Sequence, residues 1–292
     1  MFWQRVITAL LLLPAVIYLV FGLPLPFFAG ALAVILLIAA WEWSQLAMAR
    51  SLTTRIAFVA TAALAQIAVV SFSPPIEFWP SLSWPIYSGE LPITILLLAV
   101  VFWCLTPILL YLYPQKISWW RNSPIIRYAL GLLLLTALWI ALVALRKTAY
   151  DSMPLKGSWL ILFVLLLVWA ADTGAYAVGK LFGKHKLAPS VSPGKTWEGF
   201  FGGLGLAIGV ALLASSILNI QSRNTLLFLV CCVLVVIASV LGDLFESLTK
   251  REAGMKDSGT IFPGHGGMLD RIDSLIAAAP LFALAALLLD IR

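Results

Sequence analysis

The sequence predicts an all-α integral membrane protein, a polytopic bundle of about nine transmembrane helices. Hydrophobic residues make up 62% of the 292 residues and charged residues only 11%, against roughly 45–50% and about 25% in soluble domains. The apolar residues also fall in runs that approach the roughly 20 residues a helix needs to cross a bilayer. A soluble domain could not cover so much apolar surface with so few charges, and a disordered chain is excluded for the same reason.

Nine apolar runs are candidate spans, and prolines or charged residues separate most of them. We expect them at about residues 6–21, 27–48, 56–72, 91–113, 125–145, 159–182, 199–218, 226–246 and 272–289. The first run lacks a small-residue cleavage site, which favours a retained anchor over a signal peptide. We divide the chain into an N-terminal scaffold of about five spans, residues 1–150, and a C-terminal catalytic region of about four, residues 151–292. Together they form one membrane unit.

Lys and Arg are unevenly divided between the two ends of the expected bundle. If nine spans alternate, 14 of the 19 Lys and Arg residues lie on the side of the N-terminus. Positive charge collects in cytoplasmic loops, so we expect the N-terminus inside the cell and the C-terminus outside. The same rule explains the net charge of +6 without a nucleic-acid partner. Anionic lipid headgroups or an anionic substrate are the functional alternatives.

Acidic residues concentrate in the second half of the chain, where ten of the 13 lie after position 150. Two polar segments there, residues 180–198 and 247–271, are expected as cytoplasmic loops. Asp172 lies well inside the sixth span, and Asp243 lies near the end of the eighth, deeper in the apolar segment than Glu246. An isolated charge within a membrane helix costs about 3 kcal/mol, so Asp172 needs a partner or a metal.

The first polar segment contains a possible phosphate-binding turn around Lys195. Residues 194–196 resemble the end of a P-loop, but Pro189 stands where that motif requires glycine, and we expect no strand before it. A nucleotide-hydrolysing P-loop is therefore rejected. We expect instead a flexible basic turn that holds phosphate at the start of the next helix.

The second polar segment carries the strongest signal. Asp243 and Glu246 share a helical face, as do Asp270 and Asp273. Mg²⁺ prefers a few carboxylate oxygens together with water and substrate phosphates. Cations and a glycine-rich turn lie between these two pairs: Lys250, Arg251, Lys256, Gly264, His265, Gly266 and Gly267. Another cation, Arg271, lies within the second pair. Phosphoryl and nucleotidyl transfer requires carboxylates that hold a metal ion, cationic side chains, and backbone amides that bind anions.

This segment resembles the phosphatidate cytidylyltransferases, also called CDP-diacylglycerol synthases. The matching positions are Ser247, Lys250, Arg251, Lys256, Asp257, Gly259, Pro263, His265, Gly266, Gly267, Asp270, Arg271 and Asp273. Residues 169–176 and 192–197 are similar to the same family, whereas Thr249 departs from it at a position that is usually apolar. The resemblance implies that CTP and phosphatidate give CDP-diacylglycerol and pyrophosphate, in a bacterial cytoplasmic (inner) membrane.

The resemblance also implies roles for individual residues. The metal ligands are expected to be Asp243, Asp270 and Glu246, holding Mg²⁺, with a second monovalent or divalent cation as an option. The catalytic residues are expected to be Asp243, Asp270, Lys250, Arg251 and Arg271. Substrate binding is expected from Lys195, Ser192, Lys256, Asp257, His265, Gly266, Gly267, Asp172 and Asp273. The attacking phosphate is already ionised, so His265 is not expected to be an essential base. The expected partners are membrane lipids and, as a homodimer, a second copy of the chain.

Three other functions stay open at this point, as does the role of Glu42. A transporter for an anionic solute could use Glu42 and Asp172, although the polar residues crowd into one half of the chain. An alcohol phosphotransferase would carry an Asp-Gly-x-x-Ala-Arg motif, which this sequence lacks. A structural scaffold would not need Asp243 and Asp270 buried near each other. Glu42, near the end of the second span, fits a functional carboxylate and a hydrogen-bonded structural one equally well.

Overall fold

The computed structural model describes residues 2–49, 51–72, 91–115, 117, 120, 122–220, 222, 224–262, 264, 266–289 and 291. Within these, the helices and strands follow one another along the chain. They are α1 (Phe2–Ile17), the π-helical turn η1 (Tyr18–Gly22), α2 (Leu25–Leu46), α3 (Leu52–Phe72), α4 (Leu91–Leu112), α6 (Pro124–Lys147), α7 (Lys156–Phe182), β1 (Lys186–Ala188), β2 (Ser192–Thr196), α8 (Trp197–Ile217), α9 (Thr225–Glu252) and α10 (Leu269–Leu288).

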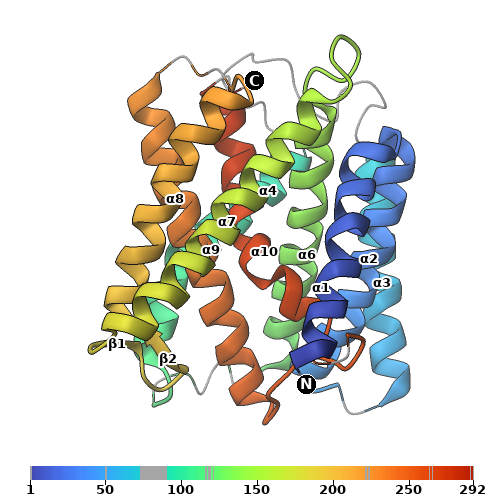
Figure 1. The fold of residues 1–292 in the computed structure, drawn as a ribbon. Helices are drawn as coiled ribbons and strands as arrows, with labels where there is room; N and C mark the ends of the chain where they lie inside the picture. The colour runs from blue at the N-terminus through green and yellow to red at the C-terminus, as the bar shows by residue number, and fades with distance from the viewer. Residues whose placement is uncertain are drawn as a thin grey trace.

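The membrane-helix prediction is confirmed. Eight described helices, α2 to α4 and α6 to α10, are long and apolar enough to cross a membrane, and a shorter apolar helix, Leu10–Gly22, precedes them. Figure 1 shows the N-terminus and the β1–β2 hairpin at one end of the bundle and the C-terminus at the other. Successive helices therefore alternate in direction, as the predicted order of spans requires.

Helix α9 is longer than the sequence suggested. Residues 247–252, expected in a loop, form its last turns. The apolar face of the helix continues there, because Leu248 and Thr249 are both buried against the bundle. Glu246 and Lys250 consequently lie one helical turn apart on a regular helix, which fixes their relative position.

The segment between α7 and α8 is a short antiparallel hairpin. Lys186 pairs with Thr196, and Ala188 pairs with Ser192. The expectation of a flexible turn around Lys195 was therefore wrong, since this residue lies on β2. Proline and glycine in the same strand give it little intrinsic strand preference, so the pairing comes from its partner β1 and from the helices around it.

Two kinds of packing hold α7, α8 and α9 in place. Helices α7 and α8 approach closely through glycine, because a Cβ atom on Gly203 would collide with the carbonyl oxygen of Ala171. On α9, Phe245 lies in a cluster of aromatic rings with centroid distances of 5.0 to 6.1 Å. The other rings belong to Trp43, Phe102, Trp103 and Trp120. This cluster fixes the turn of α9 that carries Asp243 and Glu246.

Candidate active site

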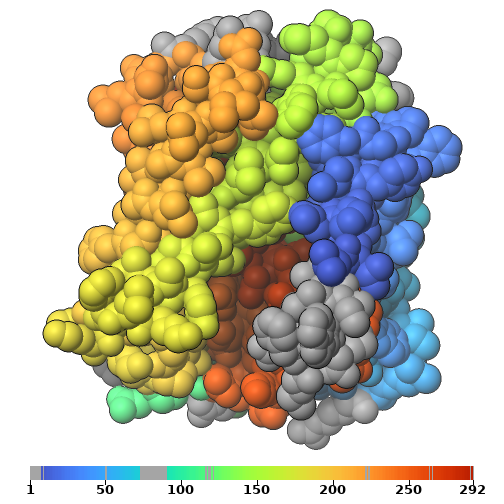
Figure 2. Space-filling model, viewed as in Figure 1, coloured from blue at the N-terminus to red at the C-terminus, as the bar shows by residue number. Residues whose placement is uncertain are grey.

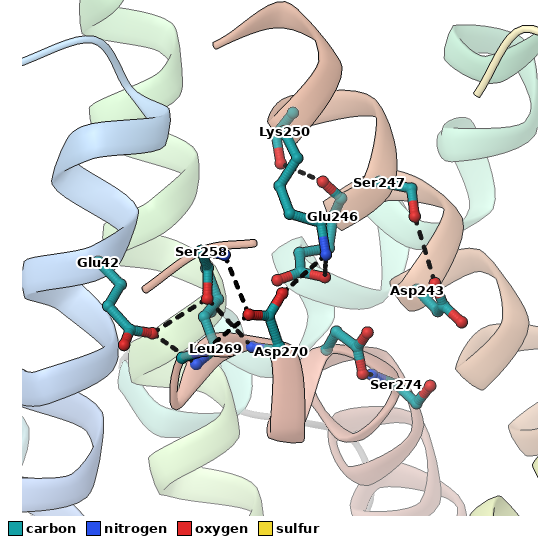
Figure 3. A network of polar contacts seen from close by, with 12 residues as sticks. Glu42, Asp243, Glu246, Ser247, Lys250, Ser258, Leu269, Asp270 and Ser274 are labelled. Carbon is teal, nitrogen blue, oxygen red and sulfur yellow. Dashed lines mark hydrogen bonds and ion pairs between the residues drawn. The ribbon is translucent and has the colours of Figure 1, made fainter. Parts of the chain in front are cut away.

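Glu42 on α2 is bound to the segment between α9 and α10. Its side chain is buried, with 1% of its surface exposed. The carboxylate accepts hydrogen bonds from the N–H groups of Met268 (3.0 Å) and Leu269 (2.7 Å) and from the Ser258 hydroxyl (3.2 Å), as Figure 3 shows in part. The first N–H groups of a helix have no partner within the helix, and a negative charge there is favourable. Glu42 therefore fixes the start of α10.

Two glycines make room for this carboxylate. A Cβ atom on Gly259 or Gly267 would collide with the oxygens of Glu42. Gly266 has a φ of 82°, in the left-handed region where glycine is favoured. The glycine-rich turn was predicted to bind substrate through its amides. In the structure, the amides of residues 267–269 bind carboxylates of the protein itself, those of Asp270 and Glu42.

Asp270 is held from three directions. Its Oδ2 atom accepts hydrogen bonds from the N–H groups of Gly267 (2.7 Å) and Ser258 (3.0 Å). Its Oδ1 atom forms an ion pair with Lys250 Nζ at 2.8 Å. Lys250 also contacts Glu246 Oε2 at 2.6 Å. Lys250 therefore ties α9 to α10, and its charge is shared by two carboxylates.

Asp243 has a different cation as its partner. Lys195 Nζ on β2 lies 2.7 Å from Asp243 Oδ2, and the Ser247 hydroxyl donates to Asp243 Oδ1 at 3.4 Å. Lys195 directly precedes Thr196, whose side chain accepts a hydrogen bond from the Gly199 N–H at 3.1 Å and caps α8. The cap fixes the end of β2 and so directs Lys195 towards α9.

A cavity of about 450 Å³ opens beside this ion pair, between α7, α8, α9 and β2. Asp172 and Lys180 of α7 line it together with Lys195 and Asp243. Its lining therefore carries two carboxylates and two cations, an arrangement suited to phosphate groups and their counterions.

The carboxylates of α7, α9 and α10 form one connected acidic group. Asp172 interacts electrostatically with Asp243, Lys195 and Arg271. Asp273 interacts with Asp243 and with Glu246. The group consists of Asp172, Asp243, Glu246, Asp270 and Asp273, against the cations Lys195, Lys250 and Arg271. Fully ionised, it carries a surplus of two negative charges.

The predicted metal ligands fit Mg²⁺ in their chemistry but are divided between two lysines. Asp243 contacts Lys195, whereas Glu246 and Asp270 contact Lys250. Among the residues that the structure describes, no three acidic, histidine or cysteine side chains are close enough to hold one ion. Their oxygens still suit a divalent cation, because Glu246 Oε1 is buried without a hydrogen-bond partner and the group has five carboxylates against three cations. The metal role stays a prediction.

The remaining predicted residues lie around this group. Arg271 is exposed, and no ion pair involves it within the described ranges. Arg251 is exposed, and its Nε atom donates to the Val191 carbonyl at 3.4 Å. Lys256 and Asp257 are exposed in the turn after α9, and Ser192 begins β2. His265 lies outside the described residues.

Sequence reasoning missed Ser258 and left Glu42 undecided. Ser258 is fully buried, and its hydroxyl bridges Glu42 and the N–H of Asp270. Its only signal in the sequence is its place before Gly259 in a polar turn, where serine is common. Glu42 lies more than 200 residues from its partners, so no local pattern could connect them.

Comparison with known proteins establishes the family. The model described as "Cytidylyltransferase family" matches residues 3–289. The chain belongs to this family. One relative is the phosphatidate cytidylyltransferase of Pseudomonas aeruginosa, 41% identical over 280 residues, which are 96% of this chain and 95% of the relative. The protein of the same name from Haemophilus influenzae is 38% identical over 283 residues, 96% of each chain. The resemblance seen in the second half of this cytidylyltransferase therefore extends through its first half.

We predict that Lys250→Met destabilises the cytidylyltransferase. The substitution leaves Glu246 and Asp270 without their shared cation, and breaking a buried ion pair costs about 3–5 kcal/mol. The midpoint of thermal unfolding in detergent is expected to fall well below the wild-type value. Adding Glu246→Gln is expected to recover part of the loss, because it removes the uncompensated buried charge.

Lys184→Met is the control for this prediction, since Lys184 is exposed and its removal is expected to leave the midpoint within about 1 °C of wild type. Unchanged unfolding of Lys250→Met would contradict the role given to Lys250. So would a double variant less stable than the single one.

Proposed function

We propose that this chain transfers CMP from CTP to phosphatidate, giving CDP-diacylglycerol and pyrophosphate for phospholipid synthesis. The proposal is supported by similarity over nearly the whole chain to relatives named phosphatidate cytidylyltransferase. The structural observation that carries it is the convergence of cations and carboxylates from α7, α9 and β2 on one cavity. Carboxylates of α10 belong to the same acidic group. Nucleotidyl transfer depends mainly on positioning and charge compensation, which such a site supplies.

The cavity between α7, α8, α9 and β2 is the proposed site for CTP. Lys180 and Lys195 line it and provide charge for the triphosphate. Binding of the triphosphate competes with Asp243 for Lys195, because their ion pair at 2.7 Å occupies the ammonium group. CTP binding and the position of Asp243 are therefore coupled.

In the proposed reaction, an oxygen of the phosphatidate phosphate attacks the α-phosphorus of CTP. The new P–O bond forms as the bond from the α-phosphorus to the bridging oxygen breaks, and pyrophosphate leaves with that bond's electron pair. A phosphate monoester is largely ionised at neutral pH, so the attack needs no strong base. Arg271 and Lys195 hold phosphate oxygens and offset the negative charge that gathers at the reacting phosphorus.

We propose Asp243 and Asp270, with Glu246, as ligands for Mg²⁺. The bound ion offsets charge on the phosphates and orients them. The excess of carboxylates over cations in the acidic group, five against three, supports this role, and the remaining carboxylates, Asp172 and Asp273, suit a second monovalent or divalent cation. In the absence of substrate, Lys195 holds Asp243 and Lys250 holds Asp270.

We place the reaction at the cytoplasmic edge of a bacterial inner membrane, with the N-terminus inside. CTP is a cytoplasmic solute and phosphatidate a membrane lipid, so the site must meet both. The end of the bundle that carries the β-hairpin also carries most of the Lys and Arg residues. Surrounding membrane lipids and a homodimer, which the family resemblance implies, are part of the proposal.

Turnover of labelled CTP tests the reaction. Purified protein in mixed micelles receives labelled CTP, phosphatidate and Mg²⁺, and formation of CDP-diacylglycerol is measured. Asp270→Asn is expected to lower turnover at least about 100-fold, because it removes a charge that the reaction needs while keeping an oxygen for the loop amides. Asp151→Asn is the matched control and should behave as wild type, since Asp151 is exposed in the turn between α6 and α7.

Full activity of Asp270→Asn would overturn the role of this carboxylate, but the proposed reaction would still stand. Absence of product with folded wild-type protein would overturn the proposed reaction.

Labelling of single cysteines tests the orientation. Ser190→Cys in the β-hairpin and Ser152→Cys in the α6–α7 turn are both exposed, and each is made in a chain whose three native cysteines are replaced by alanine. In spheroplasts, a membrane-impermeant maleimide should label position 152 and leave position 190 unmodified. In inverted membrane vesicles the pattern should reverse. The opposite result in the two preparations would place the site outside the cell.

A further inference from the structure

A second cavity is lined by Arg271, one of the cations that accompany the acidic group. Its volume is about 380 Å³, and its walls come from α1, η1, α2, α6, α7 and α10 together with Phe262. The lining is aliphatic and aromatic except for one charged side chain, that of Arg271. The apolar walls include Val16, Leu36, Leu142, Leu165 and Leu275. An apolar cavity with one cation suits a ligand that has an apolar chain and an anionic head.

Arg271 stands between this apolar cavity and the carboxylates. It lies in the first turn of α10, next to Asp270, and lines the apolar cavity. It also interacts electrostatically with Asp172, which lines the polar cavity. Its side chain is exposed, and no ion pair within the described ranges holds it. The guanidinium is therefore available to an anionic group placed between the two cavities.

We propose that the apolar cavity binds an acyl chain of phosphatidate and that Arg271 binds its phosphate at the cavity mouth. This inference rests on the proposed function and adds to it the place of the lipid. The phosphate then lies beside the acidic group, two of whose members, Asp172 and Asp243, line the nucleotide cavity. From there a phosphate oxygen attacks the α-phosphorus on the side opposite the leaving pyrophosphate, as in-line displacement requires.

The surface of the molecule agrees with entry from the bilayer. Figure 2 shows the side of the bundle hollowed below α7, and the dark red surface of α10 forms the deep part of this hollow. A lipid substrate arrives within the membrane, so its site needs an opening on the side of the bundle. Burial of the chain among apolar side chains then favours binding in proportion to its length.

A third cavity serves as a comparison. It is larger, about 580 Å³, and it lies between α2, α3 and α6. Its lining is mostly apolar as well, but its one charged side chain is that of Lys147, in the last turn of α6 and far along the bundle from the α9–α10 turn. Apolar lining alone therefore does not distinguish a lipid substrate site, whereas contact with Arg271 does.

A pair of matched substitutions tests the proposal. Leu165→Trp fills the cavity beside Arg271, and Leu37→Trp fills the comparison cavity; both leucines are partly buried. Leu165→Trp is expected to raise KM for dioleoyl phosphatidate at least about fivefold, and to leave KM for CTP and for dihexanoyl phosphatidate at wild-type values. Leu37→Trp should change none of them. A wild-type KM for the long-chain lipid in Leu165→Trp, or an equal change for both chain lengths, would overturn the proposal.

A second measurement does not depend on turnover. Phosphatidate with a photoreactive diazirine near the end of one acyl chain is irradiated with wild-type protein, and the labelled residues are mapped by mass spectrometry. Labels are expected on the parts of α1, α7 and α10 that line the cavity, and unlabelled phosphatidate should displace them. Phosphatidylcholine with the same chains should not. Labelling elsewhere, or equal displacement by both lipids, would overturn the lipid site even if the enzyme turns over CTP. Labelling in the cavity without turnover would support the lipid site but contradict the proposed reaction.

Discussion

The carboxylate of Glu42 determines where the site's other charges lie. It accepts three hydrogen bonds from the Ser258 hydroxyl and the first amides of α10, and charge-assisted bonds of this kind are stronger than neutral ones. With the start of α10 fixed, Asp270 meets Lys250, and Lys250 meets Glu246 on α9. One carboxylate from the first half of the chain thus positions the segment between α9 and α10 in the second half. The expected regions 1–150 and 151–292 therefore depend on each other, because Glu42 of the first fixes the start of α10 in the second.

This arrangement explains how so many charges are accommodated in an apolar bundle. Each buried carboxylate has a cation or backbone amides as partners, so its transfer from water is compensated. Lys195 and Lys250 hold the acids in two clusters, and among the described residues no ion pair holds Arg271. A transport path through Glu42 finds no support, because three donors already occupy its carboxylate. The polar cavity at Lys195 and the apolar cavity at Arg271 instead suit a reaction between a nucleotide and a lipid.

The sequence predicted the helices well, because each span is a long apolar run that only a transmembrane helix satisfies. It also predicted that the charged cluster lies in the second half of the chain. A carboxylate within an apolar span is unfavourable unless it has a partner, so its presence indicates a cluster of polar groups. It did not predict the β-hairpin around Lys195, whose strand residues have little intrinsic preference for a strand. The extension of α9 depended on burial of Leu248 and Thr249, which no local pattern reveals. The contact between Glu42 and Leu269 spans 227 residues, and only the folded chain brings them together.

Hydrogen exchange in the Glu42→Gln variant tests the central role of this carboxylate most directly. Glutamine keeps one acceptor oxygen but turns an NH₂ group towards backbone N–H donors. Amides in residues 258–269 are expected to exchange at least about tenfold faster than in wild type, which corresponds to about 1.4 kcal/mol. Glu198→Gln is the control, since Glu198 accepts from the amides of Lys184 and His185 just before the hairpin, and it should affect only that region. Unchanged exchange at 258–269 in Glu42→Gln would contradict the account.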